Sequence, residues 1–225
     1  GLLIYHKIGA GKTCTAVSIA EKFKNKMKIL VVLPASLIGN FRDELRSQCG
    51  GENYISNSNR ELLKTLKPRS KMFKKIINES DKKINKFYTI YSYHKFSELV
   101  DNRRIRLRNT LLIIDEVQNM VSDTGTFYTN LKYLVDKADS KTKLILLSAT
   151  PMFDKPVELA LTMNLFRLKE EMPVGKDFSN QFLKPFKINN ETHYKINNVD
   201  ELKPYLDGYI SYYRGASPKA FPKDN

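Results

Sequence analysis

The fold is decided by the stretch Ile8-Gly9-Ala10-Gly11-Lys12-Thr13. An apolar run over residues 2–5 precedes it, and apolar residues recur at helical spacing over residues 12–26, so we expect a strand, a glycine-rich turn and a helix in that order. Backbone N–H groups of such a turn and of the following helix N-terminus bind phosphate oxygens. His6 stands where the usual pattern has a glycine. An ordinary glycine-rich turn with a surface lysine is the alternative.

Composition limits the class of protein. The chain has 225 residues, 41% of them hydrophobic, which is enough for a proper core. No apolar run approaches the roughly 18 residues of a membrane span. Cys14 and Cys49 cannot make a disulfide framework, so a reducing, intracellular compartment is expected. The net charge of +14 favours a polyanionic partner such as nucleic acid, and a general richness in lysine is the alternative.

Short apolar runs alternate with helical patterns along the chain. They cover residues 2–5, 29–33, 88–91, 111–114 and 144–147, and residues 209–213 are a further candidate. After Phe166 the periodicity weakens, and residues 189–192 are expected to form a loop. Uninterrupted apolar runs are typical of strands that are buried on both faces of a parallel sheet. The fold class is therefore predicted to be α/β, a doubly wound, mostly parallel sheet with helices on both faces. Ligands of such sheets bind at the carboxyl ends of the strands.

Two segments concentrate positive charge. The first, about residues 61–87, is predicted to be a helical insertion with a turn at Pro68 or at Ser80-Asp81. The second, residues 103–108, carries four arginines just before the run at 111–114. Each is either a phosphate-binding surface or a solvated face, and charge alone does not decide between the two.

Asp115 and Glu116 follow the apolar run 111–114 and complete a predicted ATP site. Lys12 is expected to reach the β- and γ-phosphates, while Thr13 and Asp115 hold Mg²⁺. Glu116 is expected to orient and deprotonate the attacking water. The alternative is a pair of acidic residues that caps a helix, because carboxylates are favoured at helix starts.

Five motifs in order resemble those of superfamily 2 helicases and translocases. The glycine-rich turn is similar to the first motif of that superfamily, and Asp115-Glu116-Val117-Gln118 is similar to the second. Ser148-Ala149-Thr150 is similar to the third motif. Residues 32–41 and 89–93 are similar to the two motifs that lie between the first and the second motif in that superfamily. The details are closest to the Swi/Snf-like ATPases of large cytoplasmic DNA viruses, a group that includes poxvirus-type nucleoside triphosphate phosphohydrolases and early transcription factor subunits. The stretches 6–13, 148–152 and 208–215 carry this finer similarity.

The resemblance implies further site residues. Pro34, Ser36 and Tyr93 are expected near the nucleic-acid backbone. Ser148 and Thr150 would couple hydrolysis to strand movement, together with Gln118, which stands where the family usually has histidine. DNA is favoured over RNA as the partner, with the transcription machinery as a further one, and the expected location is a viral factory in the cytoplasm or the virion.

The resemblance also predicts a RecA-like lobe over residues 1–166 and an extension over residues 167–225 that leads toward a second RecA-like lobe. Arg167 and Arg214 lack the context of an arginine finger. Because such fingers contribute about 10³- to 10⁵-fold in rate, the chain alone is expected to be nearly inactive. The alternatives are a different phosphate-loop NTPase, such as a GTPase, and an idle nucleic-acid-binding module of a transcription complex.

Overall fold

A parallel sheet forms the centre of the computed structural model, which describes residues 1–7, 9–121, 125–150, 156–189 and 191–213. Within that part of the chain the sheet has six strands in the order β3-β2-β4-β5-β1-β8, and every neighbouring pair is parallel. The strands are β1 (Leu2–His6), β2 (Lys28–Leu33), β3 (Tyr88–Ser92), β4 (Thr110–Ile114), β5 (Lys143–Ser148) and β8 (Ile210–Tyr213). The predicted α/β class and all six predicted strands are confirmed.

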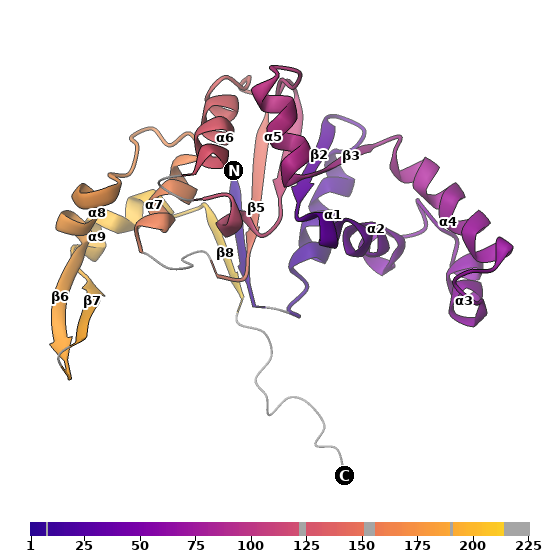
Figure 1. Ribbon diagram of the computed structural model, residues 1–225, viewed down its shortest axis with the longest axis horizontal. Coiled ribbons are helices and arrows are strands. Elements are labelled where there is room, and N and C mark those ends of the chain that lie inside the picture. Colours follow the sequence, from indigo (N-terminus) through magenta and orange to yellow (C-terminus); the bar gives the residue numbers. More distant parts are fainter. Residues whose placement is uncertain (8, 122–124, 151–155, 190, 214–225) are drawn as a thin grey trace, which may run out of the picture.

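Helices cover both faces of this sheet (Figure 1). One face carries α1 (Lys12–Phe23) and α2 (Ile38–Arg46), whereas the other carries α5 (Tyr93–Asp101), α6 (Thr126–Asp136), α7 (Val157–Asn164) and α8 (Gly175–Phe182). Short 3₁₀ turns follow three strands or helices: η1 (Ala35–Leu37), η2 (Gln48–Gly50) and η3 (Val117–Asn119). No helix of the described residues is both long enough and apolar enough to cross a membrane.

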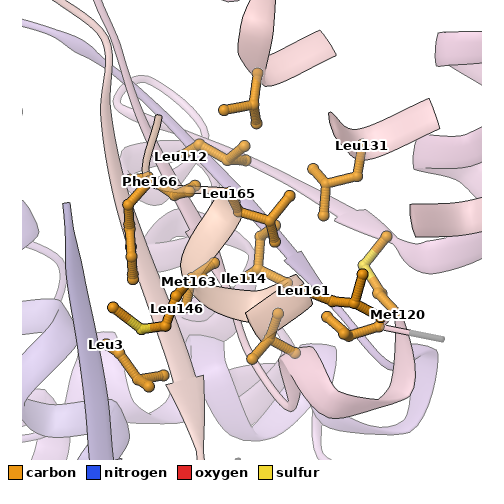
Figure 2. Close-up of a cluster of buried hydrophobic side chains, with 14 of the residues drawn as sticks. Leu3, Leu112, Ile114, Met120, Leu131, Leu146, Leu161, Met163, Leu165 and Phe166 are labelled. Atoms are coloured by element: carbon orange, nitrogen blue, oxygen red, sulfur yellow. The ribbon is translucent and has the colours of Figure 1, made fainter. Parts of the chain in front are cut away.

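Alternation along the strands divides the core into two layers. Successive side chains of a strand point to opposite faces. Leu112 and Ile114 of β4 therefore pack with one set of helices, and Leu111 and Ile113 pack with the other. Figure 2 shows the first layer, in which Leu112, Ile114 and Leu146 lie beside Leu161, Met163 and Leu165. Both layers are fully buried, which explains the uninterrupted apolar runs.

The predicted basic insertion forms α3 (Asn57–Thr65) and α4 (Lys71–Ile84), at one end of the molecule (Figure 1). The turn falls at Pro68, between the two helices. The alternative turn at Ser80-Asp81 is wrong, because both residues lie inside α4. Asp81 accepts hydrogen bonds from Arg42 and Arg46 of α2, and these ion pairs fix α4 against α2.

The region after Phe166 contains more regular structure than its weak periodicity predicted. A hairpin of β6 (Leu183–Ile188) and β7 (Glu191–Ile196) projects at the opposite end from α3 (Figure 1), and α9 (Val199–Leu206) follows it. The predicted loop over 189–192 is too long, because Glu191 and Thr192 belong to β7. The hairpin side chains are mostly exposed on both faces, so they lack the alternation of apolar and polar residues that identifies a strand.

Candidate functional site

The glycine-rich turn joins β1 to α1 at the carboxyl edge of the sheet. Gly9 and Gly11 have φ angles of 77° and 74°, in the left-handed region that favours glycine. Gly11 is the N-cap of α1, and the first turn of that helix contains no acidic residue. Because no carboxylate of its own occupies this end of α1, the amide groups and the positive dipole end of the helix can bind an anion. Ile8 lies outside the described residues.

Lys12 lies against the two carboxylates that follow β4. Its Nζ is 2.5 Å from Oε1 of Glu116 and 3.5 Å from Oδ1 of Asp115. Asp115 is only 5% exposed, and burial raises the pKa of its carboxyl, with a further rise from Glu116 and an opposing effect of Lys12. The fold therefore brings these three predicted residues together from two separate strand ends.

Hydrogen bonds extend from this ion pair to the end of β5. Gln118 Nε2 donates to Oε2 of Glu116 at 2.7 Å, and Oγ of Ser148 donates to Oε1 of Gln118 at 2.7 Å. The amide of Thr150 then donates to Oγ of Ser148 at 3.0 Å. A continuous series of contacts, which we call the relay, links Lys12, Glu116, Gln118, Ser148 and Thr150.

Tyr93 supports the backbone of the acidic pair. Its hydroxyl lies within hydrogen-bond distance of the carbonyl oxygens of Asp115 and of Glu116, the latter at 2.8 Å. Burial raises the pKa of the Tyr93 hydroxyl, so it stays a neutral donor. Glu116 itself has φ 51° and ψ 48°, a left-handed conformation that costs a non-glycine residue about 1–3 kcal/mol. Such strain persists where the surroundings fix it, as Tyr93 does here.

Pro34 and Ser36 lie at the same edge of the sheet, in the turn after β2. Pro34 is the N-cap of η1, and Ser36 is exposed. Among the described residues, neither side chain forms a hydrogen bond with the relay. Their position leaves Ser36 accessible to a partner.

Two adjoining cavities open beside the glycine-rich turn. One, of about 340 Å³, is lined in part by Lys12, Thr13, Cys14 and Glu116, and the other, of about 190 Å³, by Thr13, Asp115 and Glu116. Glu44 of α2 lines both cavities. Sequence reasoning missed Glu44, since no motif or spacing set it apart from other helical acidic residues.

Cys14 and Cys49 form a disulfide beside this site. It joins the first turn of α1 to η2 and closes a ring of 35 residues. Two cysteines are too few for a disulfide framework and favour a reducing compartment, so the sequence does not predict this pair. No spacing could have revealed it, because the two residues meet only after α2 packs on α1.

His6, which replaces the expected glycine, is a buried end residue of β1. It is 8% exposed, its Nε2 lies 3.1 Å from Oγ of Ser211, and its ring meets Tyr213 edge-on. Both partners belong to β8. The His6 side chain thus helps to attach β8 to β1. The turn does not need a glycine at position 6, because Gly9 and Gly11 are the residues that adopt its left-handed conformations.

A parallel sheet with a glycine-rich turn after β1, carboxylates after β4 and a hydroxyl after β5 defines the RecA-like lobe of superfamily 2 helicases. A family model described as "Type III restriction enzyme, res subunit" matches residues 1–153. The chain belongs to this family, and the resemblance to superfamily 2 helicases is confirmed.

Relatives in large DNA viruses are also similar to this chain. "Putative ATP-dependent RNA helicase R563" of Acanthamoeba polyphaga mimivirus is 53% identical over 99% of the chain. "Termination factor NPH-I homolog" of African swine fever virus is 24% identical over 94% of it. The chain spans 39% of the first relative and 28% of the second.

Among solved structures, the "Sulfolobus solfataricus SWI2/SNF2 ATPase core in complex with dsDNA" superposes with a TM-score of 0.59 at 18% sequence identity. The match covers 95% of this chain and 40% of that one. At this identity the likeness shows the fold alone, and that fold is the one the sequence predicted.

Proposed function

We propose that this chain is the ATP-binding lobe of a nucleic-acid-dependent ATPase, a helicase or a double-strand translocase. One observation carries the proposal: Lys12, Asp115 and Glu116 converge at the carboxyl edge of the sheet, beside the N-terminus of α1. A cation, two carboxylates and free helix amides are the groups needed to hold a nucleoside triphosphate with its metal ion.

The donor set fits Mg²⁺ and ATP. Thr13 and Asp115 line the same cavity and offer the oxygen ligands that Mg²⁺ prefers. We assign phosphate binding to the turn from Ile8 to Thr13, metal binding to Thr13 and Asp115, and charge neutralisation to Lys12. When bound, Mg²⁺ neutralises developing charge on the phosphates and orients them.

Glu116 is the proposed general base, and the relay is the proposed coupling device. Glu116 Oε1 is held by Lys12 and Oε2 by Gln118, so both carboxylate oxygens have fixed partners. Any movement of Glu116 on nucleotide binding would change its bond with Gln118 and, through it, the position of Ser148. Thr150 would pass that change to the surface. Tyr93 acts as a positioning residue through the Asp115 and Glu116 carbonyls.

Nucleic acid is the proposed partner, with DNA favoured over RNA. The net charge of +14 fits a polyanion, and the name of the Sulfolobus structure states that its protein is bound to dsDNA. Pro34, Ser36 and Tyr93 are proposed contacts, because they lie at the same edge as the relay. The African swine fever virus relative, named as a termination factor homolog, supports a link to viral transcription.

We further propose that residues 1–166 form the ATP-binding lobe and that residues 167–225 extend it toward a second RecA-like lobe. β8 belongs to the extension and adds an edge strand beside β1. The second lobe would provide the arginine finger, which the described residues do not place at the site.

Glu116→Gln tests the assignment. In the full-length protein with DNA or RNA present, the variant should lose ATP turnover by on the order of 10²- to 10⁴-fold, the usual contribution of a general base. ATP affinity should stay within about twofold, because Gln keeps the size of Glu and can still accept one of its two hydrogen bonds. Glu61→Gln on exposed α3 is the matched control. Unchanged turnover in Glu116→Gln refutes the assigned base.

A further inference from the structure

A further cavity lies at the amino edge of the sheet, away from the two cavities of the ATP site. It has a volume of about 380 Å³ and forms where the end of α5, the segment leading into β4, and α6 meet. α5 and α6 pack side by side on one face of the sheet (Figure 1). We call this cavity the basic pocket; its lining residues are Val100, Arg103, Ile105, Arg106, Leu107, Arg108, Tyr133, Leu134 and Lys137.

The basic pocket has an apolar interior. Val100, Leu107 and Leu134 are buried, at 8%, 3% and 6% exposure, and Ile105 is half-buried. These side chains belong to the core cluster between the sheet and the helices or pack against it. A group that enters this cavity therefore meets hydrocarbon, and an apolar side chain would gain the most from burial there.

Four cations surround this interior, and none has a carboxylate partner among the described residues. They are exposed Arg103, Arg106, Arg108 and Lys137. The nearby acidic residues are engaged elsewhere: Asp101 with Asn130, Asp136 with Lys132, and Asp139 with the turn around Thr142. No acidic residue lines the pocket. The lining therefore carries an excess of positive charge, which favours an anionic ligand.

The backbone that carries these arginines is fixed. The amide of Arg103 donates to the carbonyl of Val100, and the amide of Arg104 donates to that of Leu99. Arg103 has φ 53°, a left-handed conformation that an arginine adopts only where its surroundings impose it. The carbonyl of Leu107 accepts from the amide of Asp139, which anchors the other end. A fixed segment loses little conformational entropy on binding.

We propose that the basic pocket binds an acidic peptide segment of a partner protein through one apolar anchor side chain. The interior takes the anchor, and the surrounding cations pair with flanking carboxylates. Tyr133, 59% exposed, and arginine are residue types enriched at protein interfaces. A single-stranded nucleic acid is less favoured, because its binding uses successive aromatic platforms. Tyr133 is the sole aromatic lining residue, and Lys137 lies over its ring at 6.0 Å.

Fluorescence anisotropy with defined probes tests the proposal. The probes are a labelled short peptide of Asp and Glu with one central Phe, the same peptide with Ser for Phe, and a single-stranded oligonucleotide. The intact chain should bind the Phe peptide on the order of tenfold more tightly than the Ser peptide, because only the former fills the apolar interior. Equal affinity for the two peptides would overturn the proposal.

Charge reversal locates the binding. Arg103→Glu/Arg106→Glu should weaken Phe-peptide binding by on the order of tenfold or more. Lys71→Glu/Lys74→Glu on exposed α4 makes the same change in net charge and should leave it nearly unchanged. An equal loss in both variants would mean attraction by net charge alone and would overturn the proposal. Loss of oligonucleotide binding in the arginine variant only, with no preference for the Phe peptide, would assign the pocket to nucleic acid instead.

Discussion

The two edges of the sheet use charge in different ways. At the carboxyl edge, Lys12 is neutralised by Glu116 and Asp115. At the amino edge, the four cations of the basic pocket have no carboxylate partners among the described residues. A site with both signs of charge suits a ligand that brings both, such as ATP with Mg²⁺, whereas a site with one sign suits an anion alone.

The largest expected effect concerns Lys12 at the carboxyl edge. Lys12→Ala leaves Asp115 and Glu116 without their cation and removes the proposed phosphate contact. Truncating a buried charge partner costs about 2–5 kcal/mol, which is roughly 30- to several thousand-fold in ATP affinity. Titration calorimetry with Mg²⁺ and ATP measures the ATP affinity. Lys22→Ala at the exposed end of α1 is the control. A loss of ATP affinity of less than about threefold would contradict the assignment of Lys12 to phosphate binding.

The Cys14–Cys49 disulfide stabilises the carboxyl edge, and no equivalent tether is described at the amino edge. Closing a ring of 35 residues stabilises a fold by about 3–4 kcal/mol in the chain-entropy account. Cys49→Ser should therefore lower the melting temperature by roughly 6–15 °C. A reductant should lower the melting temperature of the natural chain similarly and leave that of the variant unchanged. A natural chain that melts identically with and without reductant contradicts the prediction.

The relay can be broken at its centre. Gln118→Ala and Ser148→Ala each remove two hydrogen bonds, one of which is the bond between them, and should each cost about 1–3 kcal/mol in the free energy of unfolding. Because the two residues are in contact, the double variant should deviate from additivity by about 0.5 kcal/mol or more. Gln118→Ala combined with Thr65→Ala on α3 is the control pair and should be additive. Additivity in both pairs would show that the relay carries no coupling.

The smallest effect comes from the raised pKa of Asp115. A raised pKa in the folded state means that the folded chain binds this proton more tightly than the unfolded chain, so ionised Asp115 costs stability above that pKa. Asp115→Asn should therefore melt at a higher temperature than the natural chain at pH 7 without nucleotide. The difference should shrink as the pH falls through the raised pKa toward about 3.8. A difference that grows on acidification would have the wrong sign.

Sequence patterns predicted the carboxyl edge better than the rest of the molecule. Lys12, Asp115 and Ser148 each follow an apolar run, and parallel strands bring such residues to one edge. Glu44 and the Cys14–Cys49 pair could not be predicted, because only the packing of α2 on α1 brings these residues to the carboxyl edge. The β6–β7 hairpin could not be predicted because its exposed faces show no alternation of apolar and polar residues. The arginines at 103–108 stand out in the sequence, but only the fold brings them next to Tyr133 of α6.

Hydrogen exchange of backbone amides, measured with and without Mg²⁺ and ATP, tests the central assignment directly. Ligands slow exchange at the amides that they bind or order. The carboxyl-edge account predicts slower exchange at residues 9–13 and 115–118, with residues 103–108 and 133–137 unchanged. Protection confined to residues 103–108 and 133–137 would place ATP in the basic pocket and contradict the account.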